Sequence, residues 1–187
     1  MTILLDVYEL SRIVKKVGLT NVMAGMESAM TEDFKRWEEF DKCARVAAHS
    51  KLGVIELMPV ADSQKYAFKY VNGHPSNTKV GVPTVMAFGA LAKVDTGYPD
   101  LLAELTLTTA IRTSVTSVMA ARALARIDSQ ILGMIGCGAQ SEFQAIAFHS
   151  LLGIKKVQIF DIDNNAVKKL ANHLAAYPEL EVVCVKT

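Results

Sequence analysis

The sequence has few cysteines, and they follow no pattern that would mark a disulfide framework or a zinc site. Its three cysteines, Cys43, Cys137 and Cys184, are odd in number and lack a CxxC spacing. They lie in apolar runs, a setting typical of reduced thiols in a cytosol rather than of paired cysteines in a secreted protein. We therefore expect a cytoplasmic protein without disulfide bonds.

Long hydrophobic runs are also missing. The stretch "MTILLDVYEL" at the amino terminus has an apolar patch, but Asp6 and Glu9 interrupt it, and no long apolar run occurs elsewhere. A secretory signal needs a continuous apolar segment, and a membrane-spanning helix needs about 20 apolar residues. The sequence thus predicts neither a signal peptide nor a contact with the membrane.

Charge of either sign is not in excess. The 20 basic and 19 acidic residues give a formal net charge of +1, and the basic residues form no stripe along the chain. A protein that binds nucleic acid needs such a stripe, because contacts to phosphates dominate its affinity. Hydrophobic residues make up 51% of the sequence, which indicates a globular chain. Nucleic acid is therefore not an expected partner.

Several catalytic signatures are absent as well. The sequence contains no nucleophile elbow, no phosphate loop ending in GK[ST] and no paired metal motif. His49 and His74 have no metal-ligand spacing to a partner, so we predict that they are structural histidines. The sequence gives no reason to expect a metal site.

The longer, amino-terminal part of the chain has the pattern of an α+β domain. A short strand is predicted at residues 2–5, and two helices follow at residues 7–18 and 21–40. Residues 44–106 then contain short runs rich in Val, Ile, Phe and Tyr, separated by turn signals such as "NGHP" and "DTGYP". This pattern predicts a mostly antiparallel sheet. Residues 104–126, rich in Ala, Thr and Ser, predict one long helix leading out of it.

The remainder of the chain alternates between strands and helices. The predicted strands lie at residues 130–136, 155–163 and 180–186, and the predicted helices at residues 139–153 and 164–178. Strand, helix, strand, helix, strand is the first half of a doubly wound sheet. The predicted fold class is therefore α/β, with an α+β domain over residues 1–126 and the first half of a Rossmann-type parallel sheet over residues 127–187.

The stretch "ILGMIGCGAQSEF" joins the first strand of this second part to its first helix. Gly136 permits the tight turn, and Gly138 lets the backbone approach a pyrophosphate, toward which the free amides at the helix start would point. Ser141 stands where the usual fingerprint has a third glycine, and a small serine can still allow close packing of helix on strand. The pattern predicts a dinucleotide-binding turn.

An acidic residue after the next strand indicates which dinucleotide is bound. Asp161 ends that strand in "FDID", where a carboxylate accepts hydrogen bonds from ribose hydroxyls and repels a 2′-phosphate. This favours NAD over NADP. The alternative is a generic glycine turn in which Asp161 or Asp163 merely caps the following helix.

Two charged residues of the predicted sheet lie in apolar surroundings. Lys69 shares one face of "KYAFKYVN" with an alanine and a valine, and Glu56 is enclosed by the apolar residues of "GVIELMPV". Because burial of an unpaired charge is costly, the two either pair with each other, face solvent on an exposed side of the sheet, or serve a site. Arg45 and Arg112 have weaker patterns, since such arginines are more often surface or ion-pair residues.

Longer strings carry a resemblance to a known family. "ARVAAHSKLGVIELMPVADSQKYAFKYVNGHPSNT" is followed by "PTVMAFGALAKVDTGYPDLLAELT", "TAIRT" and "IGCGAQSEFQAIAFH". Together they closely resemble the family of the bacterial ornithine cyclodeaminases and mu-crystallin, over nearly the whole chain. Cys137 differs from the residue expected between the two glycines, but that position contributes mainly backbone.

The resemblance implies a lyase of amino-acid metabolism in which NAD is a catalyst and is not consumed. A hydride leaves the α-carbon of L-ornithine to NAD and gives an imine, the δ-amine closes a five-membered ring, ammonia departs, and the returning hydride yields L-proline. The net redox change is zero. The implied protein is a cytoplasmic homodimer that forms proline.

Residue roles also follow from the resemblance. Arg45, Lys69 and Arg112 would hold the α-carboxylate by charge-assisted hydrogen bonds. Glu56 would face the amino groups of the substrate and so select a diamine, and Glu56 and Lys69 would be the catalytic residues. The residues implied for the cofactor are Thr84 on the nicotinamide side, Ala139 and Gln140 at the pyrophosphate, and Gly136, Gly138 and Asp161.

The resemblance further implies a division of roles along the chain. Residues 1–126 would form the substrate-binding and dimerisation domain, and residues 127–187 part of an NAD-binding domain. The family's aspartate general acid and base and the second half of the nucleotide domain would lie beyond residue 187. The chain is thus expected to be a fragment or a truncated gene product that does not turn over ornithine alone.

Two alternatives to a cyclodeaminase stay open. One is a ketimine reductase or an amino-acid dehydrogenase of the same family, and the other is a non-catalytic binding protein similar to mu-crystallin. Glu56 and the string "KYVNGHPSNT" favour the cyclodeaminase, because a reductase of small imines needs no second contact to an amine.

Overall fold

The computed structural model describes residues 1–185, which fold into two compact units. The first unit contains residues 1–17 and 30–109, and the second contains residues 18–29 together with the chain from Ala110 onward. Among the helices of residues 1–185, none is both long and apolar enough to cross a membrane.

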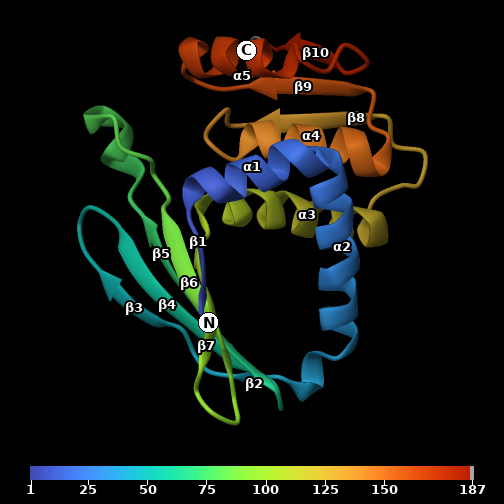
Figure 1. Ribbon diagram of the computed structural model, residues 1–187. Helices are drawn as coiled ribbons and strands as arrows, with labels where there is room; N and C mark the ends of the chain where they lie inside the picture. Colours follow the sequence, from blue (N-terminus) through green and yellow to red (C-terminus); the bar gives the residue numbers. More distant parts are fainter. Residues whose placement is uncertain (186–187) are drawn as a thin grey trace. The chain divides into compact units, whose positions relative to one another are not determined.

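The first unit is built on a seven-stranded sheet, whose central strands lie side by side in Figure 1. The strands are β1 (Ile3–Leu5), β2 (Asp41–Lys42), β3 (Val46–His49), β4 (Val54–Ala61), β5 (Lys65–Gly73), β6 (Ala87–Lys93) and β7 (Pro99–Glu104). Their order is β1-β7-β6-β5-β4-β2, with β3 also pairing with β4. All pairs are antiparallel except β1 with β7. The predicted, mostly antiparallel sheet is confirmed.

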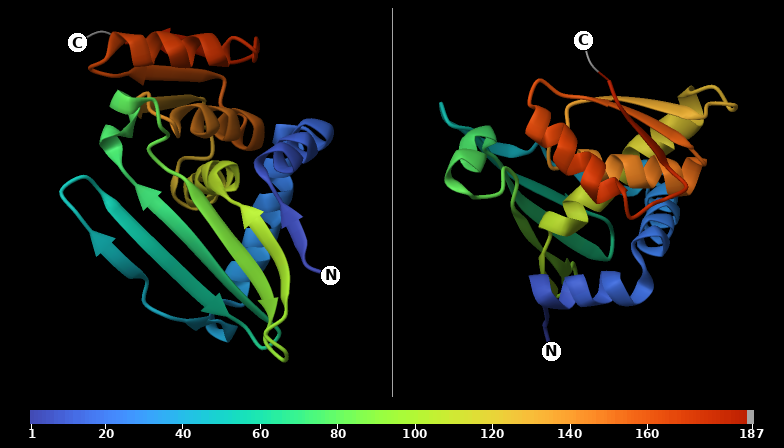
Figure 2. Two further views of the ribbon diagram at one scale, coloured as in Figure 1. Left: turned by 60° about the vertical axis from the view of Figure 1, so that its left-hand side comes forward. Right: turned by 90° about the horizontal axis from the view of Figure 1, so that it is seen from above.

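The register of this sheet decides which side chains share a face. Met58 of β4 lies opposite Lys69 of β5, and Lys69 lies opposite Gly89 of β6. Because opposed residues point to the same side and alternate along each strand, Lys69 and Glu56 share one face. We call this the lysine face. The left view of Figure 2 shows these strands side by side in a twisted sheet.

The opposite face of the sheet carries aromatic residues, and we call it the aromatic face. Tyr70 of β5 lies opposite Phe88 of β6, and their rings stack with centroids 4.8 Å apart. The register adds Leu57 of β4 and Leu102 of β7 to this face. Phe88 remains 52% exposed and Leu102 42% exposed, so much apolar surface stays in contact with solvent.

The helices near the amino terminus differ in part from the prediction. Helix α1 (Val7–Val17) ends at Gly18, whose φ of +88° suits the left-handed turn that closes a helix. Helix α2 (Leu19–Lys35) is shorter than the predicted segment 21–40. Arg36 leaves the helical conformation, with φ −105° and ψ 27°, and a short 3-10 helix follows over Trp37–Glu39. A second 3-10 helix spans Pro75–Val80.

The second unit contains a parallel sheet of three strands in the order β10-β9-β8. Its elements are α3 (Thr106–Leu124), β8 (Ile131–Ile135), α4 (Ser141–Leu152), β9 (Lys156–Phe160), α5 (Asn164–Leu174) and β10 (Glu181–Cys184). Buried residues such as Ile146, Val157 and Leu174 form the core between helices and strands. The predicted first half of a doubly wound sheet is confirmed.

The chain passes from the first compact unit to the second within helix α3, between Thr109 and Ala110, whereas the predicted boundary was at residue 126. From Ala110 onward it belongs with the second unit. There Arg122 pairs with Glu27 of α2 at 3.0 Å and donates to the carbonyl of Leu151 at the end of α4, also at 3.0 Å. The assignment of residues 1–126 and 127–187 to separate functions stays a prediction.

Candidate functional site

The glycine turn follows β8 directly and is anchored to the neighbouring strand. Gly136 has a φ of +99°, which a residue with a side chain rarely adopts, and its N–H donates to the carbonyl of Phe160 at 2.8 Å. Among residues 1–185, a Cβ atom built at Gly136 or at Gly138 would meet no heavy atom within 4 Å other than those of its two chain neighbours. The backbone of the turn therefore borders open space that a ligand can approach.

Asp161 faces this turn from the end of β9. Its Oδ2 accepts a hydrogen bond from the backbone N–H of Cys137 at 2.7 Å, and its Oδ1 accepts one from Asp163 N–H at 2.9 Å. These amides, first that of Asp163 and then that of Cys137, hold the pKa of Asp161 below its usual range. Asp161 is thus a carboxylate anion at neutral pH, placed beside the glycine turn.

The capping role belongs to the other aspartate. The Asp163 side chain accepts a hydrogen bond from Asn165 N–H at 2.8 Å, as an N-cap residue of α5 does. Asp161 and Asp163, which the sequence alone left as alternatives for capping, therefore have different positions. Only Asp161 contacts the glycine turn.

The start of α4 closes the turn on its other side. Ser141 is buried, and its hydroxyl donates to the carbonyl of Gly138 at 2.6 Å, which fits the predicted close packing at the third fingerprint position. Gln140 precedes the helix, and its side-chain Oε1 is buried without a hydrogen-bond partner in the described part of the chain. Burial raises the pKa of the Cys137 thiol, with a further contribution from Asp161, so this thiol stays protonated.

These features fit a dinucleotide. The turn has open space where its glycines lack side chains, and a helix begins immediately after it, so backbone amides are available to an anion. An ionised carboxylate stands at the end of the next strand, and within residues 1–185 the buried oxygen of Gln140 has no hydrogen-bond donor. The fit rests on Gly136, Gly138, Ala139, Gln140 and Asp161, which lie together in the second unit.

In the first unit, Glu56 forms an ion pair with Arg45. The Arg45 Nη1 and Glu56 Oε1 atoms are 3.0 Å apart, and the side chain of Glu56 is 20% exposed while that of Arg45 is 60% exposed. The carboxylate of Glu56 is thereby neutralised locally on the lysine face. An exposed arginine partner can be exchanged for another cation at little cost, because it can return to water.

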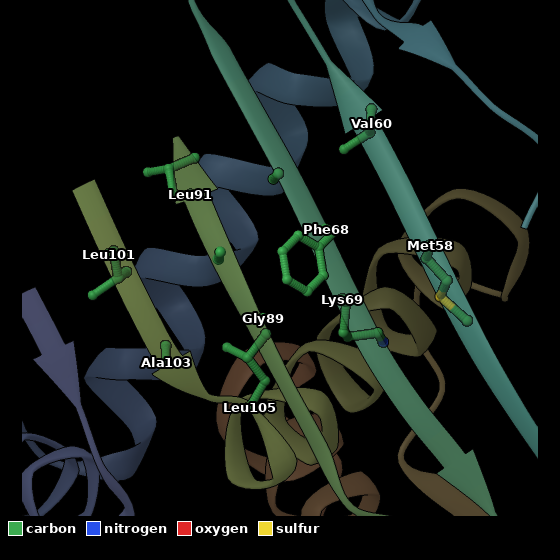
Figure 3. Close-up of a pocket in the computed structure, with 11 residues that line it drawn as sticks. Met58, Val60, Phe68, Lys69, Gly89, Leu91, Leu101, Ala103 and Leu105 are labelled. Carbon is green, nitrogen blue, oxygen red and sulfur yellow. The ribbon is translucent and has the colours of Figure 1, made fainter. Parts of the chain in front are cut away.

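A hollow lies on the same sheet, lined by residues of its central strands. Its volume is about 260 Å³, and Figure 3 shows Lys69 among the apolar side chains around it. The lining residues are Met58, Val60, Ala67, Phe68, Lys69, Gly89, Ala90, Leu91, Leu101, Ala103 and Leu105. Within residues 1–185, Lys69 is the one charged side chain in this lining. The hollow thus combines hydrocarbon walls with a single cation.

The other two predicted residues lie on different elements. Thr84 belongs to the connection between the second 3-10 helix and β6, and its carbonyl accepts a hydrogen bond from His74 N–H at 2.9 Å. Arg112 is an exposed residue of α3 in the second unit. The structure therefore brings together Arg45, Glu56 and Lys69 in one unit and the glycine-turn residues in the other. That the two groups form one site stays a prediction.

Sequence reasoning missed Asn72. This residue is buried at the end of β5, and its side chain contacts both His74 and the backbone of Met86. In the sequence, the "NGHP" string indicates a turn and assigns no role to the asparagine. A polar residue next to Val71, near the end of a central strand, is the signal that could have found it.

The parallel strands, the glycine turn and the acidic residue after the second strand define a Rossmann-type nucleotide-binding protein. The chain belongs to the ornithine cyclodeaminase/mu-crystallin family, whose model matches residues 9–187.

Comparison with known proteins finds relatives both among cyclodeaminases and among amino-acid dehydrogenases. Ornithine cyclodeaminase of Agrobacterium fabrum is 52% identical over 160 residues, which is 86% of this chain and 45% of that protein. A lysine cyclodeaminase structure that recognises L-lysine, L-ornithine and L-2,4-diaminobutyric acid matches 97% of this chain and 55% of its own, with a TM-score of 0.89 and 28% identity. An archaeal alanine dehydrogenase dimer with bound NAD matches 99% and 56%, with a TM-score of 0.83 and 28% identity. The chain spans about half the length of the curated relatives it matches.

Proposed function

We propose that the complete protein is an ornithine cyclodeaminase, an NAD-dependent ammonia-lyase that converts L-ornithine to L-proline and ammonia. The observation that carries the proposal is the 52% identity with a curated ornithine cyclodeaminase over 86% of the chain. The local geometry of both units supports it, because each unit supplies one half of what the reaction needs. NAD supplies the acceptor that takes a hydride from the substrate α-carbon and returns it.

The second unit holds the cofactor in this proposal. Gly136 and Gly138 let the pyrophosphate approach the backbone, with Ala139 and Gln140 beside it, and the amides at the start of α4 stabilise its charge. Asp161 accepts hydrogen bonds from the ribose hydroxyls. Its ionised state supports this role, because an anion at that position repels the 2′-phosphate of NADP. Residues 127–187 then act as part of an NAD-binding domain.

The first unit binds the substrate. Lys69 holds the α-carboxylate with Arg45 and with Arg112 of α3, while Glu56 accepts hydrogen bonds from a substrate amine. The Arg45 and Glu56 pair supports this assignment, since the carboxylate of Glu56 has a cationic partner in this unit. The apolar walls around Lys69 suit the methylene groups of a diamine. Thr84 lies on the nicotinamide side.

Two further properties belong to the same proposal. The aromatic face exposes apolar surface around Phe88 and Leu102, which supports a homodimer formed through residues 1–126. The alanine dehydrogenase with the same fold is itself a dimer. A cytoplasmic location agrees with cysteines Cys43, Cys137 and Cys184, which are all free thiols.

The deciding experiment is to incubate the complete protein with L-ornithine and a catalytic amount of NAD. We expect proline and ammonia to form in equal amounts without net production of NADH, because the hydride returns to the substrate. An amino-acid dehydrogenase would instead accumulate NADH in proportion to the ammonia released. A binding protein similar to mu-crystallin would retain the cofactor and release neither product.

A further inference from the structure

A buried asparagine connects β5 to the segment that carries Thr84. Asn72 is 7% exposed, and its backbone N–H donates to the carbonyl of Met86 at 3.1 Å. Its side-chain Oδ1 accepts a hydrogen bond from the N–H of Met86 at 2.6 Å. Two residues further, His74 N–H donates to the Thr84 carbonyl at 2.9 Å. The segment from Thr84 to Met86 is thus held at both ends by Asn72 and His74.

These contacts determine the orientation of the Asn72 amide. The N–H of Met86 can only donate, so the side-chain atom that faces it must be the oxygen Oδ1. The nitrogen Nδ2 therefore faces Nδ1 of His74, at a distance of 3.0 Å. An amide nitrogen can only donate as well, so His74 Nδ1 must accept, and the proton of the neutral ring lies on Nε2.

The imidazole of His74 has little room to turn away from this arrangement. A Cβ atom built at Gly53 would lie 2.9 Å from His74 Cγ and 2.2 Å from the carbonyl oxygen of Gly73. The backbone of the β3–β4 turn therefore packs directly against the ring. Steric contact on one side and the Asn72 amide on the other hold the ring in one orientation.

The geometry points to Asn72 and His74 as positioning residues for the segment from Thr84 to Met86. The His74 backbone N–H binds the Thr84 carbonyl, and the Nδ1-acceptor tautomer of His74 orients the Asn72 amide that accepts from Met86 N–H. Neither residue needs to contact cofactor or substrate. The inference rests on the proposed function in one respect, namely that Thr84 contacts the nicotinamide side of NAD. The tautomer itself follows from the hydrogen bonds alone, so it can be tested separately.

The first test measures the tautomer. The complete protein is labelled with 15N-histidine, and the signal of His74 is assigned by its loss in His74→Asn. At a pH where the ring is neutral, we expect the proton on Nε2 and an unprotonated Nδ1. A proton on Nδ1 would overturn the inference, whether or not the protein turns over ornithine.

The second test uses two variants that differ in whether the side chain at position 74 has a hydrogen-bond acceptor. In His74→Asn, the side-chain Oδ1 can occupy the place of Nδ1 and accept from Asn72, whereas His74→Leu places a methyl group there and leaves the buried amide without its acceptor. Loss of that acceptor is expected to weaken NAD binding by about tenfold, and His74→Asn is expected to restore most of the affinity. Equal affinities for NAD in the two variants would contradict the inference.

A ligand without nicotinamide distinguishes a loss of Thr84 positioning from a general destabilisation of the fold. ADP-ribose lacks nicotinamide, so its affinity depends on the adenosine and pyrophosphate contacts and not on Thr84. We expect His74→Leu to weaken NAD while leaving the affinity for ADP-ribose within about twofold of the parent protein. Parallel loss of both ligands would mean that the variant only destabilises the fold and would overturn the assignment. The exposed change Asn172→Asp on α5 serves as the control for both ligands.

If the parent protein binds neither NAD nor ADP-ribose, the proposed function fails while the tautomer measurement still decides whether Asn72 fixes His74. If it binds both ligands and His74 carries its proton on Nδ1, the proposed function stands and the positioning role fails. The two failures are therefore distinguishable.

Discussion

The backbone N–H of Cys137 donates a hydrogen bond to Oδ2 of Asp161 at 2.7 Å, and this contact joins the glycine turn after β8 to the end of β9. The same carboxylate accepts the N–H of Asp163 through its other oxygen. Asp161 is therefore oriented by hydrogen bonds within the chain itself, and the turn is held at the position where its backbone borders open space. Such preorganisation lowers the ordering cost of binding.

Replacing Asp161 with serine is expected to weaken NAD binding by about tenfold or more and to narrow the preference for NAD over NADP. The serine cannot repel a 2′-phosphate, and it loses the charged acceptor for the ribose hydroxyls. Calorimetry with both cofactors measures the ratio of the affinity for NAD to the affinity for NADP. Asp163→Ser is the matched control, because serine can still cap α5 and Asp161 keeps its contact with the glycine turn, so the ratio should stay unchanged. If the ratio of the NAD and NADP affinities is the same in Asp161→Ser as in the parent protein, Asp161 does not bind the ribose hydroxyls.

Lys69→Met should raise the ornithine concentration needed for half-saturation while leaving NAD binding nearly intact. The change removes a charge-assisted hydrogen bond worth ~1.5 to 3 kcal/mol but keeps a side chain of similar size in the apolar lining. Steady-state kinetics on the complete protein check this. Lys65→Met is the control on the same strand, since Lys65 pairs with Asp100 at the surface. Lower thermal stability with unchanged saturation would instead mean that Lys69 is only an ion-pair residue.

Glu56→Gln should reduce discrimination between ornithine and amino acids that have one amine. A neutral amide keeps the shape of the side chain but no longer pairs with an ammonium group, so the diamine loses its advantage. The measurement is the ratio of kcat/KM for ornithine to that for alanine, with product analysis for each. A ratio equal to that of the parent protein would remove Glu56 from the substrate contacts.

Asp62 is expected to govern the acid stability of the first unit. The amides of Gln64 and Lys65, together with Arg36 at 2.7 Å, lower the pKa of Asp62 to about 2 from its ordinary value of 3.8. A depressed carboxyl pKa contributes stability that is fully present above the ordinary value and is lost as the pH falls through the folded value. Asp62→Asn should therefore be less stable than the parent at pH 6, and urea unfolding should show the difference shrinking between pH 4 and pH 2. A difference that stays constant with pH would assign the effect to packing.

Phe88→Glu should convert the complete protein from a dimer to a monomer. The residue lies in the middle of the aromatic face, is 52% exposed, and stacks on Tyr70. A charge there would have to be desolvated in an interface formed by this face. Light scattering after gel filtration measures the mass. Leu52→Glu on the β3–β4 turn is an exposed control, and a dimeric Phe88→Glu would place the interface elsewhere.

Local patterns were sufficient to predict the order of the elements. Short runs rich in Val, Ile, Phe and Tyr, separated by turn signals, predicted the strands of the first unit. Gly18 and Gly153, which have positive φ values, directly follow α1 and α4. The glycine turn could be predicted for the same reason, because turn geometry depends on a few adjacent residues. Helix α2 was the exception, since its pattern continued past Arg36, where the backbone leaves the helix.

Which side chains and elements contact one another depended on residues that are distant in the sequence. The sequence left open whether Glu56 pairs with Lys69, faces solvent or serves a site, and the pairing of β3 with β4 brings Arg45 to it. The sequence also offered Asp161 and Asp163 as equal candidates for a cap, and only the position of the glycine turn beside β9 separates them. Packing likewise places α3 from Ala110 onward with the second unit. Side-chain periodicity is a property of one element, whereas these contacts arise from strand register and helix packing, which bring together residues far apart in the chain.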